Sequence, residues 1–232
     1  MPFYDFWRNK SVTALGRSWT RQAARYTLGR IRANVTPLKH IVEIGPGRGV
    51  FMQACKAACL RYTALDANLG FLQGLDHAAT VHAVAPQLPL GEGVADAVVA
   101  THVIEHLPDM PRATSFLAEM ARITRPGGLV VVTAPDLLWY GGYFYDCDYS
   151  HNFPTSARRL HQMFLDQRLE VVCLEYVFNH LTGWPGVLAG LGARMIPYAA
   201  PGALPTSALY NDRIYKSRLT FARGVFIIGR RV

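Results

Sequence analysis

A glycine-rich turn holds the residue types best suited to binding chemistry in this chain. Residues 43–49 read EIGPGRG and begin within the apolar run at 40–44. An apolar run that leads into glycines is typical of a buried strand ending in a tight loop. Glycine can adopt positive φ and lets a ligand approach the backbone closely. A helix beginning near residue 49 would add unpaired N–H groups. We therefore expect a ligand at this turn.

The glycine spacing differs from two common phosphate-binding loops. A dinucleotide loop needs G-x-G-x-x-G, but the third glycine, Gly49, comes one residue early and Val50 stands at the required position. The nucleoside triphosphate pattern G-x-x-x-x-G-K-[ST] does not occur in the sequence. Asp66 ends a second expected strand, and a carboxylate there can accept two hydrogen bonds from a ribose. The pattern favours a nucleoside-containing ligand that lacks a pyrophosphate.

Residues 102–106 read HVIEH and match H-x-x-E-H, a zinc-peptidase motif. That motif works on a helix, which brings both histidines to one face, whereas here an expected strand ends at His102 and Pro108 follows. We therefore exclude a peptidase. We also expect no metal ion, although a divalent ion bound by acids and a histidine of this turn, with His151 as a further ligand, is the alternative. His106 and His151 are candidates for acid–base catalysis or substrate positioning, because an imidazole titrates near neutral pH. The alternative is a structural turn in which His106 packs against the ligand.

Apolar strands alternate with amphipathic helices along most of the chain. The expected strands are 40–44, 61–66, 80–84, 94–101, 129–134, 169–178 and 221–229. The expected helices are 49–59, 68–76, 111–124 and 155–167, the last with Thr155 as its N-cap. Continuously apolar strands between helices predict an α/β fold with a mostly parallel sheet covered on both faces. In such a sheet ligands bind beyond the carboxyl ends of the strands, where the strand order reverses.

Composition and charge limit the class of protein and the kinds of binding partner that the chain can have. Half of the 232 residues are apolar and 17% are charged, which excludes a disordered chain. The net charge of +8 gathers at the ends, since residues 1–40 hold eight Lys/Arg and one acid, and residues 213–232 hold six Lys/Arg and no acid. No recognisable nucleic-acid module accompanies this charge, so we expect no nucleic-acid partner. A solvated helix face, an anionic membrane surface and an acidic substrate all remain open.

Four stretches make the chain resemble the class I S-adenosylmethionine-dependent methyltransferases. They are VEIGPGRG at 42–49, Asp66, LPLGEGVADAVVATHVIEHLPD at 88–109 and RITRPGGLVVVTAPD at 122–136, with a fainter match at 148–164. The resemblance covers residues 38–178 and the last strand. It is nearest to the broad superfamily that includes ubiquinone/menaquinone-biosynthesis and glycan-modifying enzymes. It implies a Rossmann-like, doubly wound, mostly parallel seven-stranded sheet with helices on both faces and an antiparallel last strand.

The resemblance also implies S-adenosylmethionine as the cofactor. Glu43 would approach its amino group, Asp66 would hold its ribose, and Ala67 would lie beside its adenine. The family usually has an acid where this chain has Val84, so backbone groups of Val84 and Ala85 would meet the adenine instead. The remaining residues assigned to the cofactor are Gly45, Gly47, Gly49, Thr101 and His102.

The acceptor site is expected to lie between the N-terminal segment, the loop at 136–153 and an insertion at 180–218. Four prolines in the insertion exclude one long helix and favour broken helices or a lid. Its apolar side chains and the basic ends of the chain suit contact with a membrane surface. The aromatic residues are either an acceptor wall or loop packing, and the candidates are Tyr140, Tyr143, Tyr145, Tyr149 and Trp184.

These observations predict a methyltransferase acting on a small molecule, by O-methylation of a lipid-like, quinone-like or glycan hydroxyl. A catalytically inactive methyltransferase-like binding protein and an RNA methyltransferase are the alternatives. We expect one domain over 1–232, made of a basic helical cap (1–38), a cofactor-binding core (39–178), an insertion (179–218) and a last strand (219–232). Four cysteines without a secretory signal favour a cytoplasmic protein, able to contact the inner membrane surface.

Overall fold

The computed structural model of this protein describes residues 11–76, 78–195 and 218–232. The described residues form a single eight-stranded sheet in the order β3-β2-β1-β4-β5-β8-β6-β7. β1 to β5 are parallel, and β8 runs antiparallel between β5 and β6. The strands are β1 (His40–Ile44), β2 (Arg61–Asp66), β3 (Ala79–His82), β4 (Ala95–Thr101), β5 (Thr124–Pro135), β6 (Leu169–Phe178), β7 (Leu181–Thr182) and β8 (Arg223–Arg231).

The α/β prediction is confirmed, with an antiparallel last strand. The eighth strand is β7, a pair of residues that folds back on β6, too short to leave a pattern in the sequence. The strand expected at 129–134 begins earlier, since β5 includes the Arg-Pro-Gly-Gly turn. The order reverses between β1 and β4, which places the crevice at the carboxyl ends of these two strands.

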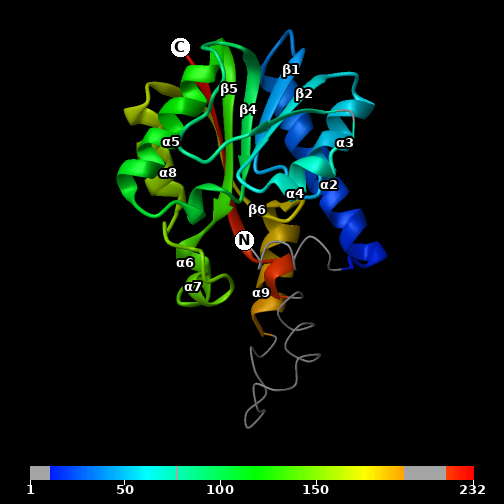
Figure 1. Cartoon of the computed structure of the whole chain (residues 1–232). Coiled ribbons are helices and arrows are strands. Elements are labelled where there is room, and N and C mark those ends of the chain that lie inside the picture. The colour runs from blue at the N-terminus through cyan, green and yellow to red at the C-terminus, as the bar shows by residue number, and fades with distance from the viewer. Residues whose placement is uncertain (1–10, 77, 196–217) are drawn as a thin grey trace.

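Helices cover both faces of the sheet, as Figure 1 shows, with α5 and α8 on one face and α2, α3 and α4 on the other. The short helices α6 and α7 and the longer α9 lie at one end of the sheet. The helices are α2 (Ala14–Asn34), α3 (Val50–Ala57), α4 (Leu69–Gln73), α5 (Met110–Ile123), α6 (Leu137–Tyr140), α7 (Tyr143–Asp146), α8 (Ala157–Asp166) and α9 (Gly183–Met195), with a 3-10 turn η1 (Ile104–His106).

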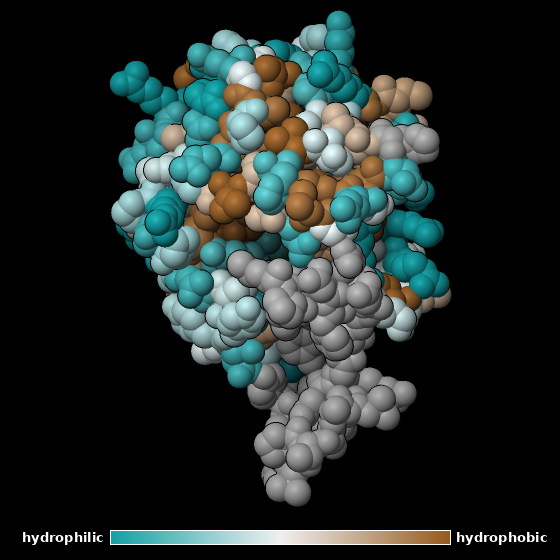
Figure 2. Space-filling model, viewed as in Figure 1, coloured by the Kyte–Doolittle hydropathy of each residue, from teal (hydrophilic) through white to brown (hydrophobic). Residues whose placement is uncertain are grey.

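Alternate residues of the central strands belong to two separate hydrophobic cores, one on each face of the sheet. On β1, Val42 and Ile44 join the core under α5 and α8, while Ile41 joins the core under α2, α3 and α4. The same alternation recurs on β4, β5 and β8, which explains why these strands are apolar without interruption. On the face seen in Figure 2, apolar side chains lie among polar ones across the upper part of the molecule.

Two local predictions need correction or refinement. Ser156, not Thr155, caps α8, because the Ser156 hydroxyl accepts from the Arg159 N–H at 3.3 Å. The Thr155 hydroxyl instead donates to the Pro135 carbonyl, which ties the loop to the end of β5. In the insertion, α9 continues through Pro185, which sits in the first turn where its missing N–H costs no hydrogen bond. Residues 196–217 of the insertion lie outside the described part of the chain.

No helix among the described residues combines the length and the apolar character needed to cross a membrane.

Candidate functional site

A cavity of about 570 Å³ lies at the carboxyl end of the sheet. Its walls come from the glycine turn after β1, the turn after β4, the loop after β5 and one face of α2. Of the residues predicted from the sequence, it brings together Glu43, Gly45, Thr101, His102, His106, Tyr140 and His151. The predicted cofactor and acceptor ends therefore meet in one space.

The glycine turn keeps its backbone close to the neighbouring strands. Gly45 has φ +69°, and a Cβ added to it would lie 2.6 Å from Val103 Cγ2. Its N–H donates to the Leu65 carbonyl at 2.8 Å. Gly49, also at positive φ, is the N-cap of α3. At Gly47, no other atom lies within 4 Å of the position a Cβ would take, which leaves room for a ligand beside the turn.

Glu43 is a buried acid that faces this cavity. Its carboxyl accepts a hydrogen bond from the Tyr62 hydroxyl. Burial raises the pKa of Glu43 to about 8, although the bond from Tyr62 works in the opposite direction. A cation placed beside Glu43 would stabilise its carboxylate, so this position suits the amino group of an amino-acid ligand.

The residues predicted to hold the ribose and adenine lie beside the cavity and do not form its wall. Asp66 ends β2, and its Oδ1 accepts from the Asn68 N–H at 2.7 Å. Burial raises the pKa of Asp66 above its ordinary value. The Ala67 carbonyl accepts from His82 Nε2 at 3.0 Å. Val84 is 60% exposed, and neither Val84 nor Ala85 lines the cavity.

The turn after β4 carries a coupled histidine and glutamate. His102 has φ +56°, and its Nδ1 lies 3.0 Å from Glu105 Oε1. Partial burial disfavours a charge on His102, but the hydrogen bond and the charge of Glu105 outweigh it and raise the pKa of His102. Glu105 itself is fully buried, and its second oxygen, Oε2, has no hydrogen-bond partner. In the sequence, Glu105 stands out only as part of H-x-x-E-H, so its burial could not be predicted.

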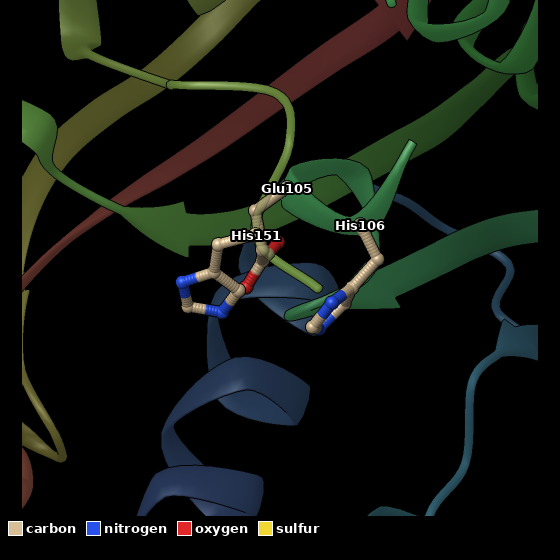
Figure 3. Close-up of side chains that lie close together, drawn as sticks. All are labelled: Glu105, His106 and His151. Atoms are coloured by element: carbon tan, nitrogen blue, oxygen red, sulfur yellow. The ribbon is translucent and has the colours of Figure 1, made fainter. Parts of the chain in front are cut away.

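The two predicted catalytic histidines lie side by side, with ring centroids 4.9 Å apart. Figure 3 shows Glu105, His106 and His151 converging from η1 and from the loop before α8. His106 Nδ1 lies 2.8 Å from Ser150 Oγ, and His151 Nδ1 lies 2.7 Å from the Phe144 carbonyl. Burial lowers the pKa of His151, which favours its neutral form.

The predicted aromatic residues divide into three groups. Tyr140 lines the cavity, and Tyr143 stacks against it with centroids 5.8 Å apart. Tyr143 belongs to a second, smaller cavity beside α9. Tyr145, Tyr149 and Trp184 are exposed and contribute no wall to the main cavity. A continuous aromatic wall is therefore absent from the described part of the main cavity.

Helix α2 supplies a wall whose individual residues the sequence analysis did not single out. Thr20, Ala23 and Thr27 line the cavity at helical spacing. Tyr26 fixes the helix to the sheet, because its hydroxyl donates to Glu175 on β6. The helical period of these small and polar residues was the available signal, but their chemistry gave no reason to choose them.

Comparisons with known proteins find methyltransferases by both sequence and fold. The family described as "Methyltransferase domain" matches residues 42–132. An uncharacterized methyltransferase of Mycobacterium ulcerans (strain Agy99) is 34% identical over 147 residues, which are 61% of this chain and 52% of the relative. The chain thus spans about half the length of the curated relatives it matches.

Two solved structures share the fold at low sequence identity. One is a Haloferax volcanii methyltransferase in complex with the Trm112 methyltransferase activator, with a TM-score of 0.65, 16% identity and coverage of 98% of this chain and 97% of that one. The other is a SAM-dependent methyltransferase from Archaeoglobus fulgidus, with a TM-score of 0.62, 19% identity and coverage of 90% and 94%. Residues 42–132 thus match a methyltransferase domain, and by its fold and its relatives the chain is similar to the class I S-adenosylmethionine-dependent methyltransferases.

Proposed function

We propose that this chain transfers the methyl group of S-adenosylmethionine to a hydroxyl of a small, lipid-like or quinone-like acceptor. The observation that carries the proposal is the single cavity that joins the glycine turn and Glu43 to His106 and His151. The residues present fit the cofactor, since Gly47 leaves open space and Glu43 presents a buried carboxyl to the cavity. A glycan hydroxyl is the second choice of acceptor.

The chain's residues have three tasks in this reaction. When bound, the cofactor supplies a methyl group on a positively charged sulfur. Glu43, the glycine turn and Asp66 hold the donor, while the cavity wall holds the acceptor oxygen in line with the methyl carbon. The acceptor oxygen forms the C–O bond as the C–S bond breaks, with the electron pair staying on sulfur. The hydroxyl proton passes to the imidazole pair, His106 and His151.

Helix α9 supports a lipid-like acceptor, because it turns small residues inward and large apolar residues outward. Gly186, Gly190 and Ala193 are buried, and a Cβ on Gly190 would lie 2.4 Å from Phe178 Cε1. The opposite face, which we term the α9 stripe, is 47% to 84% exposed and consists of Trp184, Leu188, Leu191 and Met195. Such spacing places all four side chains on one side of the helix.

Basic side chains lie at the same end of the molecule as the α9 stripe. Trp19 of α2 contacts Phe221 with ring centroids 5.1 Å apart, and Phe221 shares the smaller cavity with Arg194 of α9. The half of α2 around Trp19 exposes Arg17 and Arg21. An apolar stripe beside cations suits an anionic bilayer, from which a lipid-like acceptor could enter the cavity.

Cofactor titration is the first test of the proposed activity. We expect micromolar binding of S-adenosylmethionine and S-adenosylhomocysteine by calorimetry, about −8 kcal/mol, and loss of binding in Asp66→Ala. Methyl-labelled cofactor should then label a hydroxylated quinone or a phenol with an alkyl tail, presented in detergent. No cofactor binding by the wild type would favour the inactive binding protein, with the exposed Val84 as the reason. Labelling of RNA instead would favour the RNA methyltransferase.

Membrane contact has its own test. We expect the protein to float with phosphatidylglycerol vesicles and not with phosphatidylcholine vesicles, and Leu188→Glu to reduce flotation at least tenfold. Leu165→Glu is the matched control, because Leu165 is 54% exposed on α8, away from the α9 stripe. Equal flotation of both variants would argue against the α9 stripe as the contact surface.

A further inference from the structure

Glu105, His106 and His151 bring three potential metal ligands together beside the main cavity. One carboxylate oxygen and one nitrogen from each ring lie within 4.8 Å of one another. All three residues also line the cavity. From this geometry we infer that Glu105, His106 and His151 hold a divalent first-row transition-metal ion, contrary to the expectation of no metal from the sequence.

Hydrogen bonds on the far side of each ring fix the same tautomer in both histidines. The Phe144 carbonyl can only accept, so His151 Nδ1, 2.7 Å away, carries the proton. Ser150 Oγ donates its own proton to Asp148 Oδ1 at 2.6 Å, so it accepts from His106 Nδ1 at 2.8 Å. In the neutral rings the Nε2 atoms then carry the lone pairs. A second hydrogen bond that orients the ring is typical of a metal-binding histidine.

Glu105 provides the independent observation that points to a cation. Its side chain is fully buried, and Oε1 is held by His102 Nδ1 at 3.0 Å. Oε2 is buried without a hydrogen-bond partner, a costly arrangement for a carboxylate. Figure 3 shows this carboxylate beside the His151 ring. A cation between Oε2 and the two Nε2 atoms would give this buried carboxylate oxygen a partner.

The donor set selects the class of ion. Two imidazoles and one carboxylate suit Mn²⁺, Fe²⁺, Co²⁺ or Zn²⁺ better than Mg²⁺ or Ca²⁺, which prefer oxygen ligands. Bonds of about 2.1 Å place tetrahedral ligands roughly 3.4 Å apart, so the side chains would close inward by about 1 Å on binding. Three protein ligands leave at least one position open toward the cavity.

The open position gives the ion a role that rests on the proposed function. An acceptor hydroxyl bound there would be oriented toward the methyl group and would lose its proton more readily. With an ion at this site, both imidazoles would hold the ion through Nε2, and the hydroxyl proton would leave to water instead of passing to His106 and His151. Binding of the ion itself requires neither the cofactor nor the acceptor, so it can be tested apart from the proposed reaction.

Metal titration of chelator-treated protein, without cofactor, tests the site. We expect one Zn²⁺ or Mn²⁺ per chain by calorimetry, at least tenfold tighter than Mg²⁺, and ligand-field absorption bands on adding Co²⁺. His151→Ala and Glu105→Gln should each weaken binding more than tenfold. His161→Ala, which removes a histidine of α8, should leave it unchanged. Asp148→Asn should weaken binding by about tenfold through Ser150 and His106.

Circular dichroism and denaturant unfolding of each variant separate a lost ligand from a lost fold. Absence of stoichiometric binding by the wild type, or binding that persists in both His151→Ala and Glu105→Gln, would overturn the inference. Cofactor binding by the chelator-treated protein is measured in parallel. If the cofactor binds and the metal does not, the metal site fails alone; if the metal binds and the cofactor does not, the proposed function fails alone.

Discussion

Arg223 Nε donates to Asp136 Oδ2 at 2.7 Å, which joins the start of β8 to the residue that follows β5. Asp136 is fully buried, and it also caps α6, since its Oδ1 accepts from the Leu138 N–H at 3.3 Å. The guanidinium of Arg223 lies 4.1 Å from the ring centroid of Tyr176 and 5.0 Å from that of Trp139. This ion pair therefore organises the end of the sheet where the loop leading to His151 begins.

Removing one partner of this pair should destabilise the protein strongly. We expect Asp136→Ala to lower the free energy of unfolding by about 3 to 5 kcal/mol, because it leaves Arg223 without its buried counter-charge. Denaturant unfolding measures the loss. Glu170→Ala is the control, since Glu170 pairs with Arg230 at 3.5 Å on the surface and should contribute less than about 1 kcal/mol. Equal losses in the two variants would contradict this account.

The stability of the protein should depend on pH through Glu43. Burial raises the pKa of Glu43 from 4.5 to about 8, so between these values the folded state keeps a proton that the unfolded chain releases. The contribution of Glu43 is thus fully present below pH 4.5 and is lost as the pH rises toward 8. The difference in unfolding free energy between wild type and Glu43→Gln should fall by up to about 1.4 kcal/mol per pH unit.

Urea unfolding at several pH values between 5 and 8 checks this slope, with each variant measured in the same buffers. Glu43→Gln keeps an oxygen that can accept from Tyr62, so the comparison isolates the titration of the carboxyl. A difference that stays constant across the range would show that Glu43 is ionised in the folded protein.

The glycine turn offers a comparison between crowding and backbone conformation. Gly45 and Gly47 both have positive φ, but only at Gly45 would a Cβ meet another side chain, Val103 Cγ2 at 2.6 Å. We expect Gly47→Ala to cost about 1 kcal/mol of stability for its φ alone, and Gly45→Ala to cost more. Adding Val103→Ala to Gly45→Ala should recover part of the loss in a double-mutant cycle. Additive losses would mean that Val103 is not the obstacle.

The sequence was sufficient to predict the fold and the position of the glycine turn beside the main cavity. The apolar strands are buried on both faces, which leaves continuous runs such as that of β5 in the sequence. Gly45, Gly49 and Glu43 were recognisable because their backbone conformation or position demands those residue types. Apolar runs and glycine positions are local features of the sequence, so they can be recognised without knowledge of tertiary contacts.

The part of the main cavity around Glu105, His106 and His151 could not be predicted in the same way, because tertiary contacts define it. Glu105 is adjacent to His106 in sequence, but its burial depends on packing that no local pattern records. Tyr145 and Tyr149 share the loop with His151, yet both are exposed and neither lines the main cavity. The Thr155 hydroxyl donates to the Pro135 carbonyl, a contact between residues twenty positions apart that the sequence does not reveal. Ser156, the next residue, is therefore the N-cap of α8.

The packing of α9 on Phe178 should be disrupted by a side chain added at Gly190 but not by one added at Gly192. A Cβ on Gly190 would lie 2.4 Å from Phe178 Cε1, whereas a Cβ on Gly192 would meet nothing within 4 Å. Gly190→Ala should therefore force α9 away from β6 and lower the free energy of unfolding by about 1 to 3 kcal/mol. Gly192→Ala should be neutral or stabilise the helix by up to about 1 kcal/mol.

If the α9 stripe delivers the acceptor to the cavity, Gly190→Ala should also slow methyl transfer while leaving cofactor affinity unchanged, since α9 contributes no residue to the glycine turn. Unfolding curves and cofactor titrations of the two variants separate these effects, and equal stability of both would contradict close packing of Gly190 on Phe178.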